Sequence, residues 1–104
     1  MPGELVALVT CPPDQAEVIA KTIVESRLAA CVNILPGITS VYSWEGAIHK
    51  DPETLLIIKT NRAFYDAFET KIKEIHPYDV PEIICVPIEL GSKAYLSWLN
   101  QSIG

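Results

Sequence analysis

Hydrophobic positions in the first third of the chain follow two different periods. Residues 5–9 form a short continuous apolar run, which predicts a buried strand, and the turn residues 10–13 end it. After this stop, apolar residues recur at helical spacing, so we predict a helix whose N-terminus is capped by Asp14, with Glu17 as the capping-box partner. The apolar stripe of this helix comprises Ala16, Ile19, Ala20, Ile23, Val24 and Leu28.

The middle of the chain has the composition of strands. Residues 31–48 are rich in β-branched and aromatic side chains and predict two extended pieces with a bend or break between them at Pro36-Gly37. Alternation places Tyr42 and Trp44 on one side of the second piece. The sequence His49-Lys50-Asp51-Pro52 is typical of a turn, and residues 54–60 are so continuously apolar that they predict a central strand.

A second helix and a last strand follow. Helical spacing of apolar residues predicts a helix from Asn61 to His76, where Pro77 forces the preceding residue out of helical conformation. Residues 76–82 contain two prolines and predict a stiff loop. Residues 83–88 predict a strand at a sheet edge, because Pro87 cannot donate to a ladder. A short helix after Gly91-Ser92 ends the chain.

The order of these elements predicts the fold class. Strand, helix, strand, strand, helix and strand, followed by a trailing helix, is the split βαβ or ferredoxin-like α+β pattern, with both main helices on one face of an antiparallel sheet. We expect one domain spanning residues 1–104. The other face of so apolar a sheet needs a cover, so the pattern also predicts an oligomer.

Charge and composition narrow the class of protein. The 104 residues include eight Lys and Arg against thirteen Asp and Glu, a formal net charge of −5. Scattered bases on an acidic chain argue against a nucleic-acid partner. Charged residues interrupt every apolar run before the roughly 18 residues that a membrane-spanning helix needs. The first residues, Met-Pro-Gly-Glu, lack the features of a secretory signal, so we expect a cytoplasmic protein.

The sequence contains three cysteines, Cys11, Cys31 and Cys85, and a lone cysteine inside an apolar strand is typically a small buried hydrophobic residue. Their spacing contains no C-x-x-C pair, so we predict neither a zinc knot nor a disulfide framework, and no cofactor is needed for folding. A cysteine hydrolase with His49 or His76 as the base is the enzymatic alternative. Apolar surroundings disfavour it, and no phosphate-loop, dinucleotide or hydrolase motif is present, so we expect no enzymatic activity.

Several ordered segments of the chain resemble the CutA divalent-cation-tolerance family. They are Arg27–Asn33, Leu35–Tyr42, Trp44-Glu45-Gly46, Ile58-Lys59-Thr60, His76-Pro77-Tyr78 with Val80–Ile83, and Tyr95–Leu99. The resemblance covers nearly the whole chain. It implies a ferredoxin-like subunit in a tight homotrimer, similar in architecture to the trimer of the PII signalling proteins. It also implies a role in tolerance of copper and other divalent cations, through metal binding or a response to metal ions.

The resemblance implies a candidate metal site. In the family it combines a Cys at the end of the first strand, a His at the His-Pro-Tyr motif and the Glu of the Pro-Glu motif. Here the candidates are Cys11, His76 and Glu82, and copper suits thiolate, imidazole and carboxylate ligands. However, the family's Cys position holds Thr10, one residue before Cys11, and a one-residue shift turns a strand side chain to the other face. Alternatively, His76 closes the second helix and Glu82 makes an intersubunit ion pair.

A second candidate site is a cleft between subunits, which would make the protein a PII-like signalling or scaffold module. Its candidate residues are Arg27, Trp44, Glu45, Lys59 and Tyr78, and its ligand would be a small anion, a metal complex or a protein partner. The alternative for the aromatic residues is that they pack the trimer interface.

Overall fold

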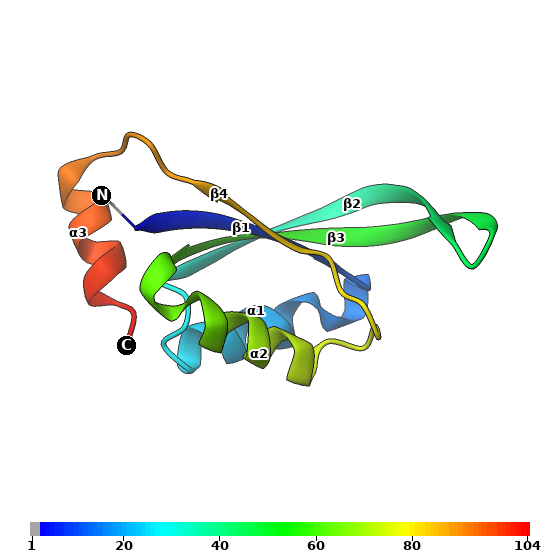
Figure 1. Ribbon diagram of the computed structural model, residues 1–104, viewed down its shortest axis with the longest axis horizontal. Coiled ribbons are helices and arrows are strands. Elements are labelled where there is room, and N and C mark those ends of the chain that lie inside the picture. Colours follow the sequence, from blue (N-terminus) through cyan, green and yellow to red (C-terminus); the bar gives the residue numbers. More distant parts are fainter. Residues whose placement is uncertain (1–2) are drawn as a thin grey trace.

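The computed structural model describes residues 3–104 as a four-stranded antiparallel sheet with helices on one face. The strands have the spatial order β2-β3-β1-β4, and the predicted order of strands and helices is confirmed (Figure 1). The strands are β1 (Glu4–Cys11), β2 (Cys31–Trp44), β3 (Ala47–Asn61) and β4 (Ile83–Pro87). The helices are α1 (Ala16–Glu25), α2 (Tyr65–Ile75) and α3 (Lys93–Gln101), and 3-10 turns at Pro13–Gln15 and Arg62–Phe64 precede α1 and α2.

The core lies between the sheet and the two main helices. Alternate residues of the central strands β1 and β3 face α1 and α2, as the period of a strand requires. Ile19 and Ile23 of α1 and Phe68 and Ile72 of α2 are fully buried against them. The strand residues of this cluster are Ala7, Val9, Cys11, Leu56 and Ile58.

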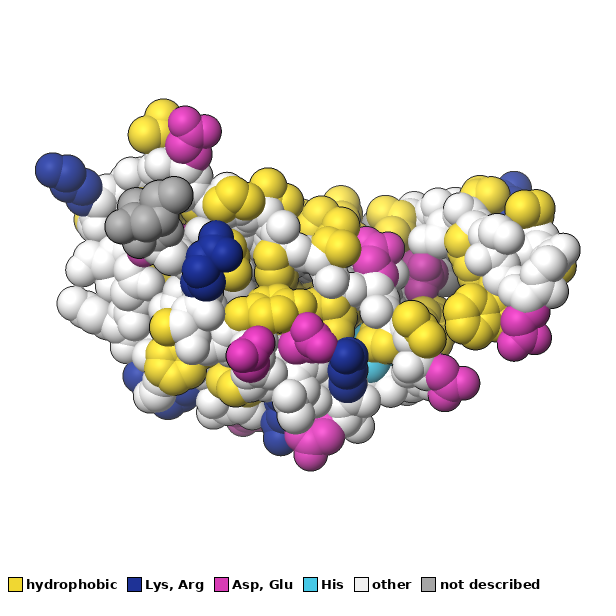
Figure 2. Space-filling model, in the orientation of Figure 1, with side chains coloured by type: hydrophobic (Ala, Val, Ile, Leu, Met, Phe, Trp, Pro, Cys, Tyr) yellow, Lys and Arg dark blue, Asp and Glu magenta, His cyan; other side chains and the backbone are white. Residues whose placement is uncertain are grey.

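The opposite face of the sheet has little cover. Helix α3 lies at one end of the sheet, where Leu99 and Ile103 form a small separate cluster with Ala30 (Figure 1). Over the rest of this face apolar side chains reach the surface, including Ile84 and Val86 of β4, which are 53% and 51% exposed. Figure 2 shows hydrophobic side chains gathered above the middle of the sheet. The predicted bare apolar face is therefore present.

Strands β2 and β3 form a hairpin that extends beyond the other strands. Its turn is Glu45-Gly46, where both residues have positive φ angles, 49° and 79°, between the paired residues Trp44 and Ala47. The turn predicted at residues 49–52 is wrong, because these residues continue β3 and pair with β2. Pro52 is tolerated there because β1 pairs with β3 only from Thr54 onward, which leaves the far side of the strand without a neighbour.

Of the bend or break predicted at Pro36-Gly37, the structure has the bend. One strand runs through it, and the pairing of β2 with β3 shifts register between Leu35 and Ile38. This irregularity, a β-bulge, bends the hairpin away from the main sheet. The outer half of the hairpin thereby stands apart from β1, and a cleft opens beside it.

Helix ends were predicted with mixed success. Asp14 does not cap α1, because it lies inside the 3-10 turn, which makes no side-chain cap hydrogen bond. Leu28, which was predicted to lie on the apolar stripe of this helix, follows the end of α1. Asn61 does cap the segment that leads into α2, since its Oδ1 accepts a 3.3 Å hydrogen bond from the Phe64 amide. The predicted end of α2 at His76 is confirmed. Among residues 3–104, no helix combines the length and apolar character needed to cross a membrane.

Candidate functional site

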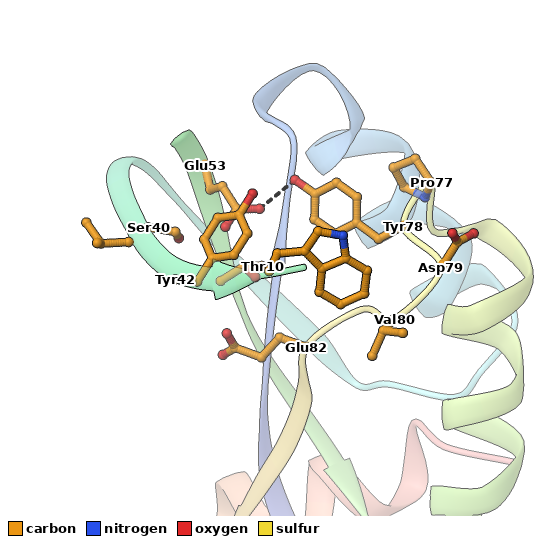
Figure 3. A pocket seen from close by; sticks show the side chains of 11 residues that line it. Thr10, Ser40, Tyr42, Glu53, Pro77, Tyr78, Asp79, Val80 and Glu82 are labelled. Atoms are coloured by element: carbon orange, nitrogen blue, oxygen red, sulfur yellow. Dashed lines mark hydrogen bonds between the residues drawn. The ribbon is translucent and has the colours of Figure 1, made fainter. Parts of the chain in front are cut away.

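The main cleft lies where the β2–β3 hairpin diverges from β1 and from the loop that follows α2. We call it the hairpin cleft; its volume is about 570 Å3. Figure 3 shows side chains from the hairpin, from the end of β1 and from the loop between α2 and β4 converging on it. The lining residues are Thr10, Ser40, Val41, Tyr42, Trp44, Glu53, Pro77, Tyr78, Asp79, Val80 and Glu82.

Glu53 is the most buried acidic residue of this lining, with an exposed fraction of 5%. The Tyr78 hydroxyl donates a 2.7 Å hydrogen bond to its Oε2 atom (Figure 3). Burial and this hydrogen bond raise the pKa of the Tyr78 hydroxyl, so Tyr78 remains a donor at neutral pH. The contact joins the loop after α2 to β3 across the lining of the cleft.

Tyr42 occupies the hairpin side of the cleft. Its hydroxyl donates a hydrogen bond to the Asp51 carboxylate, and its ring stacks on that of His49 with centroids 5.4 Å apart. The Asp51 hydrogen bond raises the pKa of Tyr42. These contacts hold the Tyr42 ring in place although it is 41% exposed.

His76 is buried beside the cleft rather than inside it. Its Nε2 lies 2.8 Å from the Thr10 carbonyl oxygen, and the Tyr78 backbone N–H donates a 3.1 Å hydrogen bond to its Nδ1. Because Nδ1 accepts, Nε2 must carry the proton and donate to Thr10. The alternative in which His76 closes α2 is borne out by its backbone N–H, which donates a 2.8 Å hydrogen bond to the Ile72 carbonyl oxygen. Its ring does not meet those carbonyls and links β1 to the following loop instead. Neither ring nitrogen is available to a metal in this arrangement.

Cys11 and Thr10 face in different directions at the end of β1. Cys11 is fully buried in the main core, whereas Thr10 lines the cleft. Burial, assisted by the Glu53 and Asp14 carboxylates, raises the pKa of the Cys11 thiol to about 11, which disfavours the thiolate that a metal requires. Glu82 lines the cleft, but within residues 3–104 no three His, Cys, Asp or Glu side chains converge as a metal site. The structure thus does not gather Cys11, His76 and Glu82 within one chain.

The candidates for the second site are divided between distant positions. Trp44 and Tyr78 line the hairpin cleft, whereas Arg27, Glu45 and Lys59 do not. Arg27 Nε and Nη2 donate to the Gly104 and Gln101 carbonyl oxygens, at 2.9 and 3.1 Å, and so hold the end of α3. Lys59 Nζ donates to Asn33 Oδ1 within the sheet, and Glu45 lies in the hairpin turn. A cleft shared between subunits remains a prediction.

The cysteines show no sign of an activated thiol. All three are free. Burial raises the pKa of the Cys85 thiol, as it does that of Cys11. His49 lies on the hairpin against Tyr42, and His76 is engaged by Thr10 and Tyr78. The geometry therefore gives no support to the cysteine-hydrolase alternative.

Sequence reasoning missed Glu53, the central acidic residue of the cleft. Glu53 lies between the turn predicted at residues 49–52 and the strand predicted from residue 54, so the pattern gave no reason to bury it. Alternation along β3 places Glu53 on the face of Leu55 and Ile57, opposite the core residues Leu56 and Ile58, and it gives no sign of the contact with Tyr78, 25 residues away.

Comparisons with known proteins find the same family along almost the whole chain. Residues 5–102 match the family model described as CutA1 divalent ion tolerance protein. The chain is 47% identical to the divalent-cation tolerance protein CutA of Thermus thermophilus over 97% of this chain and 99% of that protein. It is 46% identical to human protein CutA, and the match spans 97% of this chain but 58% of the human protein. The rice relative, chloroplastic protein CutA 1, is 50% identical over 94% of this chain and 56% of its own length.

Solved structures show the same fold. The Thermus thermophilus divalent cation tolerance protein superposes with a TM-score of 0.94 at 47% identity, covering 97% of this chain and 99% of that chain. CutA1 from Oryza sativa gives a TM-score of 0.95 at 46% identity, and the match covers 99% of this chain and 95% of that chain.

Proposed function

Because the chain belongs to the CutA1 divalent ion tolerance protein family, we propose that it contributes to tolerance of divalent cations, copper first among them, by binding a cation. The observation that carries this proposal is the family match over residues 5–102. The hairpin cleft supports it, because its charged lining residues, Glu53, Asp79 and Glu82, are all acidic. The net charge of −5 adds a weak long-range attraction for cations.

The ligand set Cys11, His76 and Glu82 does not fit copper within one subunit. Copper would have to displace a hydrogen bond of His76 and deprotonate a fully buried thiol. We therefore propose that Glu82 and other groups at the cleft bind the cation, and that a second subunit completes the ligand set. No role for a metal in folding is proposed, since the core is built from apolar side chains.

The assembly proposed here is a homotrimer of ferredoxin-like subunits, similar to the PII trimer. Two features support an assembly: the uncovered apolar face, and the edge strands β2 and β4, each of which has a neighbour on one side only. An exposed edge and an apolar face are the features that subunit contacts cover. Sedimentation equilibrium at micromolar concentration should give three times the mass of the 11.5 kDa chain. A stable monomer would contradict the proposal.

Metal titration by calorimetry tests the cation proposal directly. We expect copper to bind more tightly than zinc or magnesium, in line with the affinity order of first-row metals. Glu82→Gln should weaken copper binding, whereas Glu17→Gln, which removes the same charge from exposed α1, should not. Unchanged affinity in Glu82→Gln, His76→Ala and Cys11→Ser would remove all three residues from the site.

The second candidate function is a PII-like signalling or scaffold module that binds a small ligand or a protein partner. The aromatic lining of the hairpin cleft favours it, because sites for small molecules are typically lined by aromatic and apolar side chains with a few polar groups. Lack of binding for every metal in the same titration would favour this function over the first.

We also propose that the protein acts without catalysis and in the cytoplasm. The first point is supported by the protonated state that burial favours for Cys11 and Cys85. The second is the expectation from the sequence alone, and the rice relative is named as chloroplastic.

A further inference from the structure

The hairpin cleft combines acidic and aromatic side chains and is lined by no Lys, Arg or His among the described residues. Its aromatic members are Tyr42 and Trp44 from β2 and Tyr78 from the loop after α2. Tyr42 and Tyr78 flank the Glu53 carboxylate in the view of Figure 3. Aromatic faces attract a cation through the ring quadrupole, and carboxylates attract it directly. Both types of side chain therefore select for positive charge in the ligand.

Glu53 is a buried carboxylate without a cationic partner. It is 5% exposed, and the ion pairs among residues 3–104 are Lys71–Glu74 and Lys73–Glu69, both on α2. Its hydrogen bond from Tyr78 satisfies one of its two oxygen atoms. A carboxylate can accept about four hydrogen bonds, and a buried charge is costly unless it is paired. Among the described residues Glu53 thus has no positively charged partner and no second protein donor, and because no buried side-chain oxygen there is left unsatisfied, its other oxygen is open to the cleft.

The aromatic lining distinguishes between two kinds of cation. A bare divalent metal needs several oxygen or nitrogen ligands converging on one point, and the described residues offer no such group of three. An organic cation needs apolar contact for its carbon atoms and acceptors for its charged end. The cleft, at about 570 Å3, falls in the size range of small-molecule sites.

We propose that the hairpin cleft binds a small organic amine in its protonated primary-ammonium form. The ammonium group donates hydrogen bonds to Glu53, and its alkyl chain lies against Trp44 and the two tyrosine rings. This inference rests on the second candidate function, since it names the ligand class of a small-ligand site. It does not depend on metal binding, so the amine proposal and the cation-tolerance proposal can fail separately.

Trp44 provides a direct reporter for this binding. The other tryptophan, Trp98, lies on α3 and does not line the cleft, so Trp98→Phe leaves Trp44 as the only indole. The protein, in its native oligomeric state and in the presence of EDTA, is titrated with n-butylammonium while tryptophan fluorescence is recorded. Tetramethylammonium tests charge without N–H donors, and n-butanol tests the alkyl chain without charge. We expect a saturable change with n-butylammonium, a weaker one with tetramethylammonium and none with n-butanol.

Matched variants assign the binding to the cleft. Glu53→Gln should weaken n-butylammonium binding at least about tenfold, because it removes the buried charge that the ammonium pairs with. Asp66→Asn, which removes one charge from the exposed surface of α2, should leave affinity unchanged. Trp44→Leu, followed by calorimetry, should also weaken binding; Trp44 is 46% exposed, so this variant keeps the core intact. Circular dichroism confirms that each variant is folded.

The outcomes separate the possible ligands. Binding of n-butanol as strong as that of n-butylammonium, or full affinity in both Glu53→Gln and Trp44→Leu, would overturn the proposal. Lysine blocked at both its backbone ends stands for a side chain of a protein partner or a second subunit, and tighter binding of this probe than of n-butylammonium would overturn the free amine as the ligand. Absence of amine binding together with copper binding would leave only the cation-tolerance proposal standing.

Discussion

The Tyr78 hydroxyl donates a 2.7 Å hydrogen bond to Glu53 Oε2 and thereby connects the loop after α2 to strand β3. The two residues are 25 positions apart in sequence, and they lie together because α2 returns the chain to the end of the sheet from which the hairpin extends. The bond gives the most buried acid of the cleft its donor.

Tyr78→Phe should therefore destabilise the protein by about 1–3 kcal/mol, because it leaves a buried carboxylate without its donor. Tyr42→Phe is the matched control: it removes a similar hydroxyl–carboxylate contact, to Asp51, from the exposed hairpin and should cost much less stability, because water replaces the lost donor. Urea denaturation of both variants measures the difference. Equal losses would mean that the burial of Glu53 has no energetic consequence.

His76 should adopt the neutral tautomer with the proton on Nε2, because its Nδ1 accepts from the Tyr78 amide. Long-range proton–nitrogen NMR spectra at pH 8 distinguish the two tautomers. His76→Ala should cost about 1–3 kcal/mol through loss of the link between β1 and the loop. A proton found on Nδ1 would contradict the observed arrangement.

Stability should fall as the pH rises from 9 to 11. Burial raises the pKa of Cys11 from 9.0 to about 11, so in this window the unfolded chain releases the Cys11 proton while the folded chain retains it. The unfolded state then binds fewer protons, and the free energy of unfolding decreases with pH. Tyr65, whose pKa burial raises from 10.0 to about 12, contributes in the same direction between pH 10 and 12.

Cys11→Ala isolates this effect. The variant loses some core packing at every pH, but its stability should decline less steeply between pH 9 and 11 than that of the parent protein. Thermal denaturation at several pH values gives both slopes. Parallel slopes would show that Cys11 does not titrate differently in the folded and unfolded chains.

The hairpin turn holds one residue, Glu45, in a strained backbone conformation that a substitution can relieve. Glu45 has a φ angle of +49°, a region in which Asn is far better tolerated, and Asn-Gly is the favoured sequence of such two-residue turns. Glu45→Asn should stabilise the hairpin by about 0.5–1 kcal/mol, whereas Gly46→Ala should destabilise it by about 1 kcal/mol. Hydrogen exchange of the β2–β3 amides near the turn reports both changes. The same sign for both variants would contradict the turn geometry.

Arg27 should stabilise the end of α3 rather than a ligand site. Arg27→Ala removes two hydrogen bonds, to Gly104 and Gln101, without changing the backbone strain at φ +59°, because both residues are L-amino acids with a Cβ. We expect faster exchange of the α3 amides and unchanged amine and copper binding. Lys21→Ala on α1 is the control. Equal exchange rates of the α3 amides in both variants would show that Arg27 does not stabilise the end of α3.

Sequence patterns predicted the elements well and the contacts poorly. The order of strands and helices, the end of α2 before Pro77 and the edge position of the strand that holds Pro87 all follow from local rules of proline and side-chain period. The turn at residues 49–52 was wrong because turn-forming residues such as Asp51 and Pro52 are tolerated in an outer strand that has a neighbour on one side.

The sequence by itself determined an acidic α+β chain of the CutA1 family with one bare apolar sheet face, because period, charge and family motifs are all local in sequence. Only the tertiary structure decided that Thr10, not Cys11, faces the cleft, and that both ring nitrogens of His76 are hydrogen-bonded to backbone groups. It also decided that Glu53 meets Tyr78. These facts depend on register, on the bulge in β2 and on segments distant in sequence, where a shift of one residue reverses which side chain faces a ligand and which enters the core.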